Sequence, residues 1–322
     1  MKARAILLLL AALALVAAAS LLLPFGPLRA LFAANPDLGL AVLGELRLPR
    51  TLLALAYGAT LGAAGAAVQA LFANPLASPD LTGTTSGAAL GAVVTAYYFN
   101  LTAPAGLAIG SVGGALLALL LLLALAGPKA ETATLLLAGL AISALAGALT
   151  TLALALAPSP FAFYDAYDWL MGSLIDRSLD QAAFAAVPGL LVILLLLRLA
   201  PALDRLALGE EVAQSLGHNI SRLRLQIVCL TALGVGACVA ICGAIGFIGL
   251  IAPIFARRLV RGHPGRAILP AAMIGALLLT AADLAVRLAP LGRTLPIGVL
   301  TALIGVPFFL WLVVHMRWRV TS

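Results

Sequence analysis

Long stretches without a charged side chain constrain this sequence more than any other feature. No Asp, Glu, Lys or Arg occurs in five runs, which cover residues 51–79, 81–128, 132–164, 225–256 and 294–316. A helix that crosses a bilayer needs about 20 predominantly apolar residues, and each run can supply at least one. Only 10% of the 322 residues are charged, whereas a soluble domain carries about 25%. The sequence therefore predicts an all-α, polytopic membrane protein.

Two of the runs are too long for one crossing and are expected to hold two helices each. Asn100, Pro104 and Gly106 supply a turn within residues 81–128. The segment "CGAIGFIGLIAP" interrupts residues 225–256 with glycines and a proline, which weaken helices. About ten helices are then expected, at residues 5–23, 50–72, 84–100, 106–126, 132–157, 182–200, 222–241, 245–260, 267–288 and 295–315. They form one transmembrane domain over residues 1–322, and the length of the first helix favours a retained span over a cleaved signal peptide.

Lys and Arg are distributed unevenly between the two sets of loops that connect ten helices. The set that includes both chain ends carries 13 basic residues, and the other set carries six. Because cytoplasmic loops collect Lys and Arg, both termini are expected in the cytoplasm. The same rule accounts for the net charge of +7 without a nucleic-acid partner. Arg47 and Arg50 fall on the outer side, against the general trend.

One of the two longest polar interruptions, residues 201–224, lies on the expected cytoplasmic side and has helical character. Its apolar residues recur near one helix face, at Leu206, Leu208, Val212 and Leu216. The pattern predicts two short helices hinged at or near Gly209. Helices that lie on lipid are typically rich in Lys and Arg, whereas this segment carries Glu210 and Glu211. We therefore interpret it as a surface for a protein partner.

Motifs of catalytic and metal chemistry are missing from the sequence. It contains no GxxxxGK[ST] phosphate loop, HExxH, GxSxG or CxxC motif. Cys229, Cys238 and Cys242 share one apolar stretch without a nearby His or carboxylate, so no metal site is predicted. Asp283 precedes Arg287 by one helical turn and is expected to pair with it rather than to relay protons. The chain is therefore predicted not to be an enzyme.

Four segments of the chain carry recognisable signatures. They are "LRLPRTLLALAYGATLGAAGAAVQALFANPLASPDLTGTTSGAALGA", "LALGEEVAQSLGHNISRLR", "GAIGFIGLIAPIFARRLV" and "LPIGVLTALIGVPFFLWL". In this order, over residues 40–315, they resemble the FecCD/BtuC-type permeases, the membrane subunits of type II ABC importers for vitamin B12, haem and ferric siderophores. The resemblance implies a BtuC-like fold that pairs as a homodimer in the bacterial inner membrane. It also implies a periplasmic binding protein and two cytoplasmic ATPase subunits, which bind ATP and Mg where this chain binds no cofactor.

The resemblance further implies three groups of site residues. The arginines that receive carboxylates of the binding protein correspond to Arg47, Arg50 and Arg287. The coupling helices, about residues 203–219, seat in a cleft on the ATPase, and their matching residues are Leu208, Gly209, Glu210, Glu211, Ala213, Leu216 and Gly217. The cytoplasmic gate corresponds to Asn74, Leu76, Thr132 and Ala133. The planar fork of Arg suits a carboxylate, although arginines can also anchor helices at lipid headgroups. For the gate, the alternative is that Asn74 and Pro75 form a plain turn.

The sequence departs from the family pattern at two positions. Ile254 stands where the family commonly has His after the proline, and Ala133 stands where a small hydroxyl residue is common at the gate. We expect a permease that imports a ferric siderophore or a similar metal chelate by alternating access, with haem and cobalamin as alternatives. A secondary transporter driven by an ion gradient is the alternative from another class. It needs buried charges or inverted repeats, and the sequence offers few charges and no clear repeat.

Overall fold

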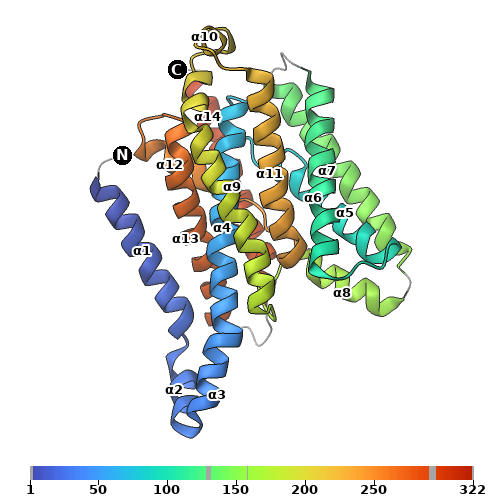
Figure 1. Ribbon diagram of the computed structural model, residues 1–322, viewed down its shortest axis with the longest axis vertical. Coiled ribbons are helices and arrows are strands. Elements are labelled where there is room, and N and C mark those ends of the chain that lie inside the picture. Colours follow the sequence, from blue (N-terminus) through green and yellow to red (C-terminus); the bar gives the residue numbers. More distant parts are fainter. Residues whose placement is uncertain (1–2, 128–131, 158, 290–294, 321–322) are drawn as a thin grey trace.

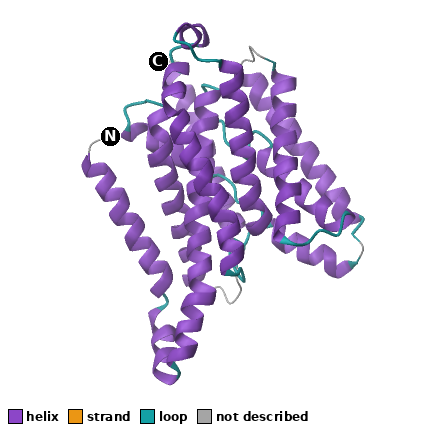
Figure 2. Ribbon diagram, in the orientation of Figure 1, coloured by secondary structure: helices purple, strands orange, loops and turns teal. Residues whose placement is uncertain are grey.

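The protein is a bundle of helices in the computed structural model, which describes residues 3–127, 132–157, 159–289 and 295–320. Figure 2 shows only helices and loops in this part of the chain. In chain order the helices are α1 (Ala3–Leu22), α2 (Phe25–Ala34), α3 (Pro36–Ala41), the π-helix η1 (Val42–Arg47), α4 (Leu48–Leu71), α5 (Thr84–Tyr98), α6 (Pro104–Ala126), α7 (Thr132–Ala155), α8 (Pro160–Leu170), α9 (Leu179–Leu206), α10 (Glu210–Ser215), α11 (Ile220–Cys242), α12 (Ile248–Leu259), the 3-10 helix η2 (Gly265–Ala267), α13 (Ile268–Leu288) and α14 (Ile297–Val320).

Each of the ten segments expected to be helical contains a helix, but several of the helices begin later or end earlier than expected. Eight helical spans among the described residues are long and apolar enough to cross a membrane. The other two of the ten, α5 and α12, have 15 and 12 residues. Both are shorter than a crossing requires. Each follows a non-helical segment, residues 72–83 before α5 and residues 243–247 before α12, so the chain covers part of these two crossings without a helix.

The remaining helices are short and lie between the long ones. α2, α3 and η1 form a hairpin that leads from α1 into α4, so the helical path of α4 begins well before the expected residue 50. α8 occupies the polar segment that connects α7 with α9. No helix was expected between residues 157 and 182, because mixed aromatic and acidic residues over 11 positions give a weak helical signal.

The centre of the bundle is α4, which packs against α9, α11, α12 and α13. Its glycines permit this close packing. A Cβ atom on Gly62 would collide with the backbone carbonyl of Ala271 in α13, and one on Gly65 would collide with the carbonyl of Gly249 in α12. Small residues let helix backbones approach closely in a membrane protein. The glycine and alanine spacing of α4 thus fixes its position between α12 and α13.

The two ends of the bundle carry different features. α10 and the last turn of α14 lie at one end, and the α2–α3 hairpin lies at the opposite end (Figure 1). The first turn of α1 lies in the same half of the bundle as α10 but farther from that end. The long helices α4, α9, α11 and α13 connect the two ends. The segment predicted to meet an ATPase and the arginines predicted to meet a binding protein are therefore presented at opposite ends.

Candidate functional site

A buried aspartate organises the hairpin end of the bundle. Asp283 of α13 is 1% exposed, and its carboxylate accepts hydrogen bonds from two arginines. The Nη2 atom of Arg50 lies 2.8 Å from Oδ1, and its Nε donates to both carboxylate oxygens at 2.9 and 3.0 Å. The Nη2 atom of Arg287 lies 3.1 Å from Oδ2. The expected pair between Asp283 and Arg287 is therefore present, and Arg50 joins it from a second helix.

Two of the predicted docking arginines, Arg47 and Arg287, hold the end of α1 against α4 and α13. Arg287 donates from Nη1 to the carbonyl of Ser20 at 2.7 Å and from Nη2 to its hydroxyl at 2.9 Å. The Ser20 hydroxyl is also 2.8 Å from the hydroxyl of Thr51. Arg47 donates to the carbonyl of Leu21 at 2.8 Å. Each of the three predicted docking arginines thus has a partner within the chain, and one aspartate balances only one of their three charges.

The predicted coupling segment contains one separate helix, not two. The first of the two expected helices is the end of α9, which continues to Leu206 because Leu203 and Leu206 are buried. Gly209 follows with a φ of +109°, a conformation that glycine adopts without a steric penalty, and α10 begins at the next residue. Ala213, within α10, is fully buried. Gly217 has a φ of +86° where the segment turns towards α11.

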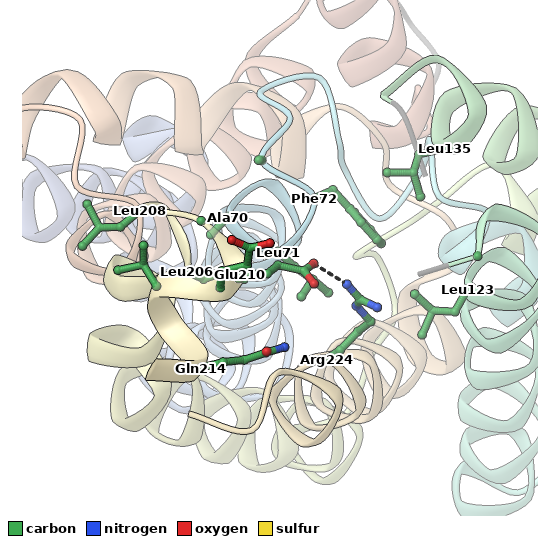
Figure 3. A pocket seen from close by; sticks show the side chains of 15 residues that line it. Ala70, Leu71, Phe72, Leu123, Leu135, Leu206, Leu208, Glu210, Gln214 and Arg224 are labelled. Atoms are coloured by element: carbon green, nitrogen blue, oxygen red, sulfur yellow. Dashed lines mark hydrogen bonds and ion pairs between the residues drawn. The ribbon is translucent and has the colours of Figure 1, made fainter. Parts of the chain in front are cut away.

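The outer face of this segment is apolar and exposed, and a cavity lies beside it. Leu208, Val212 and Leu216 are exposed. Figure 3 shows the cavity, which has a volume of 780 Å³ and is bounded by α10 and by the ends of α4, α6 and α7. At its rim the Oε1 atom of Glu210 lies 2.8 Å from Nη2 of Arg224 in α11. Of the two predicted acidic residues, Glu210 is thus engaged with α11, while Glu211 lines the cavity and makes no ion pair in the described structure.

The predicted gate residues lie in the loop that follows α4 and at the start of α7. Asn74 is buried, and its Oδ1 accepts a hydrogen bond from the backbone N–H of Leu76 at 2.9 Å. Within the described part of the chain, its Nδ2 has no hydrogen-bond partner. Thr132 and Ala133 begin α7, but their side chains lie outside the described residues. The turn expected from "NP" is present at Asn74, whereas its approach to Thr132 and Ala133 stays a prediction.

A second, half-buried carboxylate joins the two non-helical segments, and sequence reasoning missed its role. The Oδ2 atom of Asp80 accepts from the backbone N–H of Phe247 at 2.8 Å, and Oδ1 accepts from the hydroxyl of Thr85 at 2.7 Å. Phe247 precedes α12 with a φ of +65°. The hydroxyl of Ser143 in α7 donates to the Asp80 carbonyl at 3.2 Å. The available signal was that Asp80 is the only charged residue between Arg50 and Lys129.

Comparison with known proteins finds one matching family and several similar sequences. The model of the FecCD transport family matches residues 6–315. The vitamin B12 import system permease protein BtuC of Vibrio cholerae is 41% identical over 88% of this chain and 86% of its own length. The Fe(3+)-citrate import system permease protein YfmE of Bacillus subtilis is 38% identical over 84% and 81%. FecD of Escherichia coli, an Fe(3+) dicitrate transport system permease protein, is 37% identical over 86% of each chain.

Solved structures give the same result for the fold. A structure described as the inward-facing conformation of a proposed metal-chelate type ABC transporter matches with a TM-score of 0.81 and 32% identity. The match covers 97% of this chain and 99% of that one. PsaBC of Streptococcus pneumoniae matches with a TM-score of 0.59 at 20% identity and supports the fold alone. The all-α, polytopic architecture expected from the sequence is confirmed.

Proposed function

This chain belongs to the FecCD transport family, and we propose that it is the membrane-spanning permease subunit of an ATP-driven ABC importer whose cargo is a ferric siderophore or a similar metal chelate. The observation that carries the proposal is the match along nearly the whole chain to permease proteins of import systems. The names of these relatives specify ferric citrate and vitamin B12, and that of a further relative, YfiZ of Bacillus subtilis, specifies a siderophore. All three are bulky metal chelates, and cobalamin or haem are therefore the alternatives within the class.

The proposed assembly contains more than one protein. Two copies of this chain pair around a central pathway, two ATPase subunits bind ATP and Mg on the cytoplasmic side, and a periplasmic binding protein delivers the cargo. Both termini face the cytoplasm of a bacterial cell, and the chain itself catalyses no covalent reaction. The last turn of α14 lies at the same end as α10, and the first turn of α1 lies in the same half of the bundle. This arrangement supports the orientation, because it places the basic loops on the side of the ATPase.

We assign ATPase coupling to residues 203–219. The exposed apolar side chains of Leu208, Val212 and Leu216 supply the area that a protein partner can bury. The turns at Gly209 and Gly217 hold α10 away from the bundle axis. The ion pair between Glu210 and Arg224 links α10 to α11, so a displacement of α10 by the ATPase is passed directly to a long membrane helix.

We assign docking of the binding protein to the opposite end of the bundle. The arginines there do not act as three free cations. Arg50 and Arg287 share Asp283, so the cluster presents a net positive field and not three separate forks. Complementary charge increases the association rate and sets the orientation more than it adds affinity. A carboxylate of the binding protein is then attracted to the cluster as a whole, and the internal hydrogen bonds keep the cluster rigid.

Alternating access requires a gate that opens at one end at a time, and we place its cytoplasmic part at Asn74, Leu76, Thr132 and Ala133. The buried Nδ2 of Asn74 has no hydrogen-bond partner among the described residues, so it is available to a group that approaches from α7 when the gate closes. Because Ala133 has no hydroxyl, the contact at that position is one of packing. Ile254 in α12 stands where the family commonly has His, so α12 has no titratable group at that position.

The secondary transporter is a less favourable alternative on physical grounds. Such carriers use ionisable residues inside the membrane as ion sites. Among the described residues, Asp283 is paired with two arginines and Asp80 accepts two hydrogen bonds from Phe247 and Thr85. These carboxylates are engaged in holding helices together.

The cargo is tested most simply with the cognate binding protein of this chain. Purified from cells without exogenous ligand, it is mixed with equimolar ferric siderophore, ferric citrate, haem and cobalamin, and the retained ligand is identified by mass spectrometry after gel filtration. The proposal predicts retention of a ferric chelate. Retention of cobalamin or haem alone would reassign the cargo, and retention of none of the four would refute the metal-chelate class.

A further inference from the structure

A cationic pocket lies apart from the three sites described above. It has a volume of 630 Å³ and is formed where the first turn of α1 meets the end of α12 and the loop to α13. Arg258, Arg261, His263 and Arg266 line it. No acidic side chain lines it among the described residues. Four basic side chains thus face one cavity whose lining carries no compensating charge.

These side chains are largely free to bind an anion. Arg258, Arg261 and His263 are exposed and have no ion pair in the described structure. The closest carboxylate to Arg266 is that of Asp204, with 3.8 Å between Nε and Oδ2, and the Arg266 side chain is 67% exposed. An exposed pair at that distance contributes little. At least three arginine charges are therefore available to a ligand.

The loop that presents these residues is held in place before any ligand binds. Arg261 and Gly262 have φ values of +56° and +87°. The backbone N–H of Gly262 donates to the carbonyl of Arg257 at 3.0 Å, and that of Gly265 donates to Oδ1 of Asp204 at 2.8 Å. A binding loop that is already ordered loses less conformational entropy when the ligand binds.

The surroundings of the pocket indicate an amphipathic ligand. Ala5 of α1 forms one wall, and α1 directs exposed apolar side chains such as Leu8 outward. Leu259 lines the pocket and is exposed, and the guanidinium of Arg258 lies 5.9 Å from the ring centre of the exposed Phe255. The basic residues therefore lie at the helix ends, and the apolar surface of α1 and α12 continues from them into the membrane-spanning region.

We propose that this pocket binds the phosphate headgroup of an anionic phospholipid, with the acyl chains along α1 and α12. Basic pockets between membrane helices on the cytoplasmic side are suited to acidic headgroups. The assignment to the cytoplasmic leaflet depends on the orientation proposed above, whereas lipid binding itself does not. A second cavity of 430 Å³ shares Arg261, His263 and Arg266 and extends to Leu208. A bound headgroup therefore lies next to the coupling segment.

Native mass spectrometry of the full-length chain in detergent tests this proposal. The protein is titrated with phosphatidylglycerol, phosphatidylcholine or inorganic phosphate. The variant carries Arg258→Gln and Arg261→Gln, which disrupt no ion pair of the described structure. The control carries Arg198→Gln and Arg222→Gln, which remove two exposed basic residues outside the pocket. Thermal unfolding of each protein confirms that it is folded.

The proposal predicts that phosphatidylglycerol binds in preference to phosphatidylcholine. The pocket variant should bind it on the order of tenfold more weakly, and the control should retain at least half of the affinity. Equal weakening in both variants would show general attraction to basic residues and overturn the site. Displacement of the lipid by an equal concentration of inorganic phosphate would indicate a soluble-anion site instead. A pocket variant that loses ATPase binding but keeps its lipid would identify a protein contact and equally overturn the proposal.

Discussion

Arg50 and Asp283 form an ion pair of 2.8 Å although 233 positions separate them in the sequence. The pair joins the start of α4 to the end of α13, and Arg287 completes it from the next turn of α13. The residues predicted to receive a partner protein therefore also hold the fold together. Experiments at this end of the bundle must distinguish the two roles.

Replacing the shared carboxylate tests the structural role. Asp283→Asn leaves Arg50 and Arg287, whose side chains are 16% and 13% exposed, without a compensating charge. Removal of one partner of a buried pair costs about 3–5 kcal/mol, so the apparent unfolding temperature in detergent should fall by several degrees. Glu45→Gln, which removes an exposed carboxylate from η1 nearby, is the matched control and should have little effect. Equal stability of the two variants would contradict the role of Asp283.

Charge reversal at Arg47 tests docking, because Arg47 makes no ion pair in the described structure and donates hydrogen bonds there only to the backbone carbonyls of Leu21 and Pro24. Arg47→Glu should reduce capture of the permease by the immobilised binding protein at least tenfold, since a like charge then faces the incoming carboxylate. The reversal Arg29→Glu, on the exposed surface of α2, should reduce it less than twofold. Capture that is unchanged by Arg47→Glu, or equally reduced by both, would reject the docking assignment.

The apolar face of the coupling segment can be tested without deleting it. Leu208→Ser together with Val212→Ser removes exposed apolar area while leaving the buried Ala213 in place. The ATPase should then copurify with the permease at least fivefold less efficiently, because the core of an interface supplies most of its affinity. Leu225→Ser, at another exposed leucine in α11, serves as the control. Full copurification of the double variant would place the ATPase contact elsewhere.

The packing of α4 against α13 predicts opposite effects at two glycines. Gly62→Ala forces a methyl group against the backbone of Ala271 and should destabilise the protein by about 1–3 kcal/mol. Gly113→Ala in α6 meets no atom within 4 Å and should be neutral or stabilising by up to about 1 kcal/mol. Thermal unfolding of both variants measures the difference. A stable Gly62→Ala variant would mean that α4 and α13 are farther apart than described.

The membrane helices were predictable because a helix that crosses a bilayer requires a long run of apolar residues, and such runs are visible in the sequence. The pair of Asp283 with Arg287 was predictable too, since residues one turn apart on a helix are neighbours. The second partner, Arg50, was not, because it reaches Asp283 only through the packing of α4 on α13. For the same reason no local pattern indicated that Asp80 contacts Phe247, which precedes a different helix.

The coupling segment shows a different limit of sequence reasoning. Apolar periodicity located it, but the same periodicity did not distinguish a separate helix from the last turns of α9. The burial of Leu203 and Leu206 by neighbouring helices extends α9 to Leu206. Tertiary packing, rather than the local pattern, decided where the helix ends.

The central claim is that ATP hydrolysis by a partner drives import through this chain. Proteoliposomes that contain the permease with its ATPase are supplied outside with binding protein and radiolabelled ferric siderophore, and uptake is measured with ATP inside. The account predicts uptake only when both ATP and the binding protein are present, and none from a proton or sodium gradient alone. Uptake driven by an ion gradient, with the ATPase absent or inactivated, would contradict it.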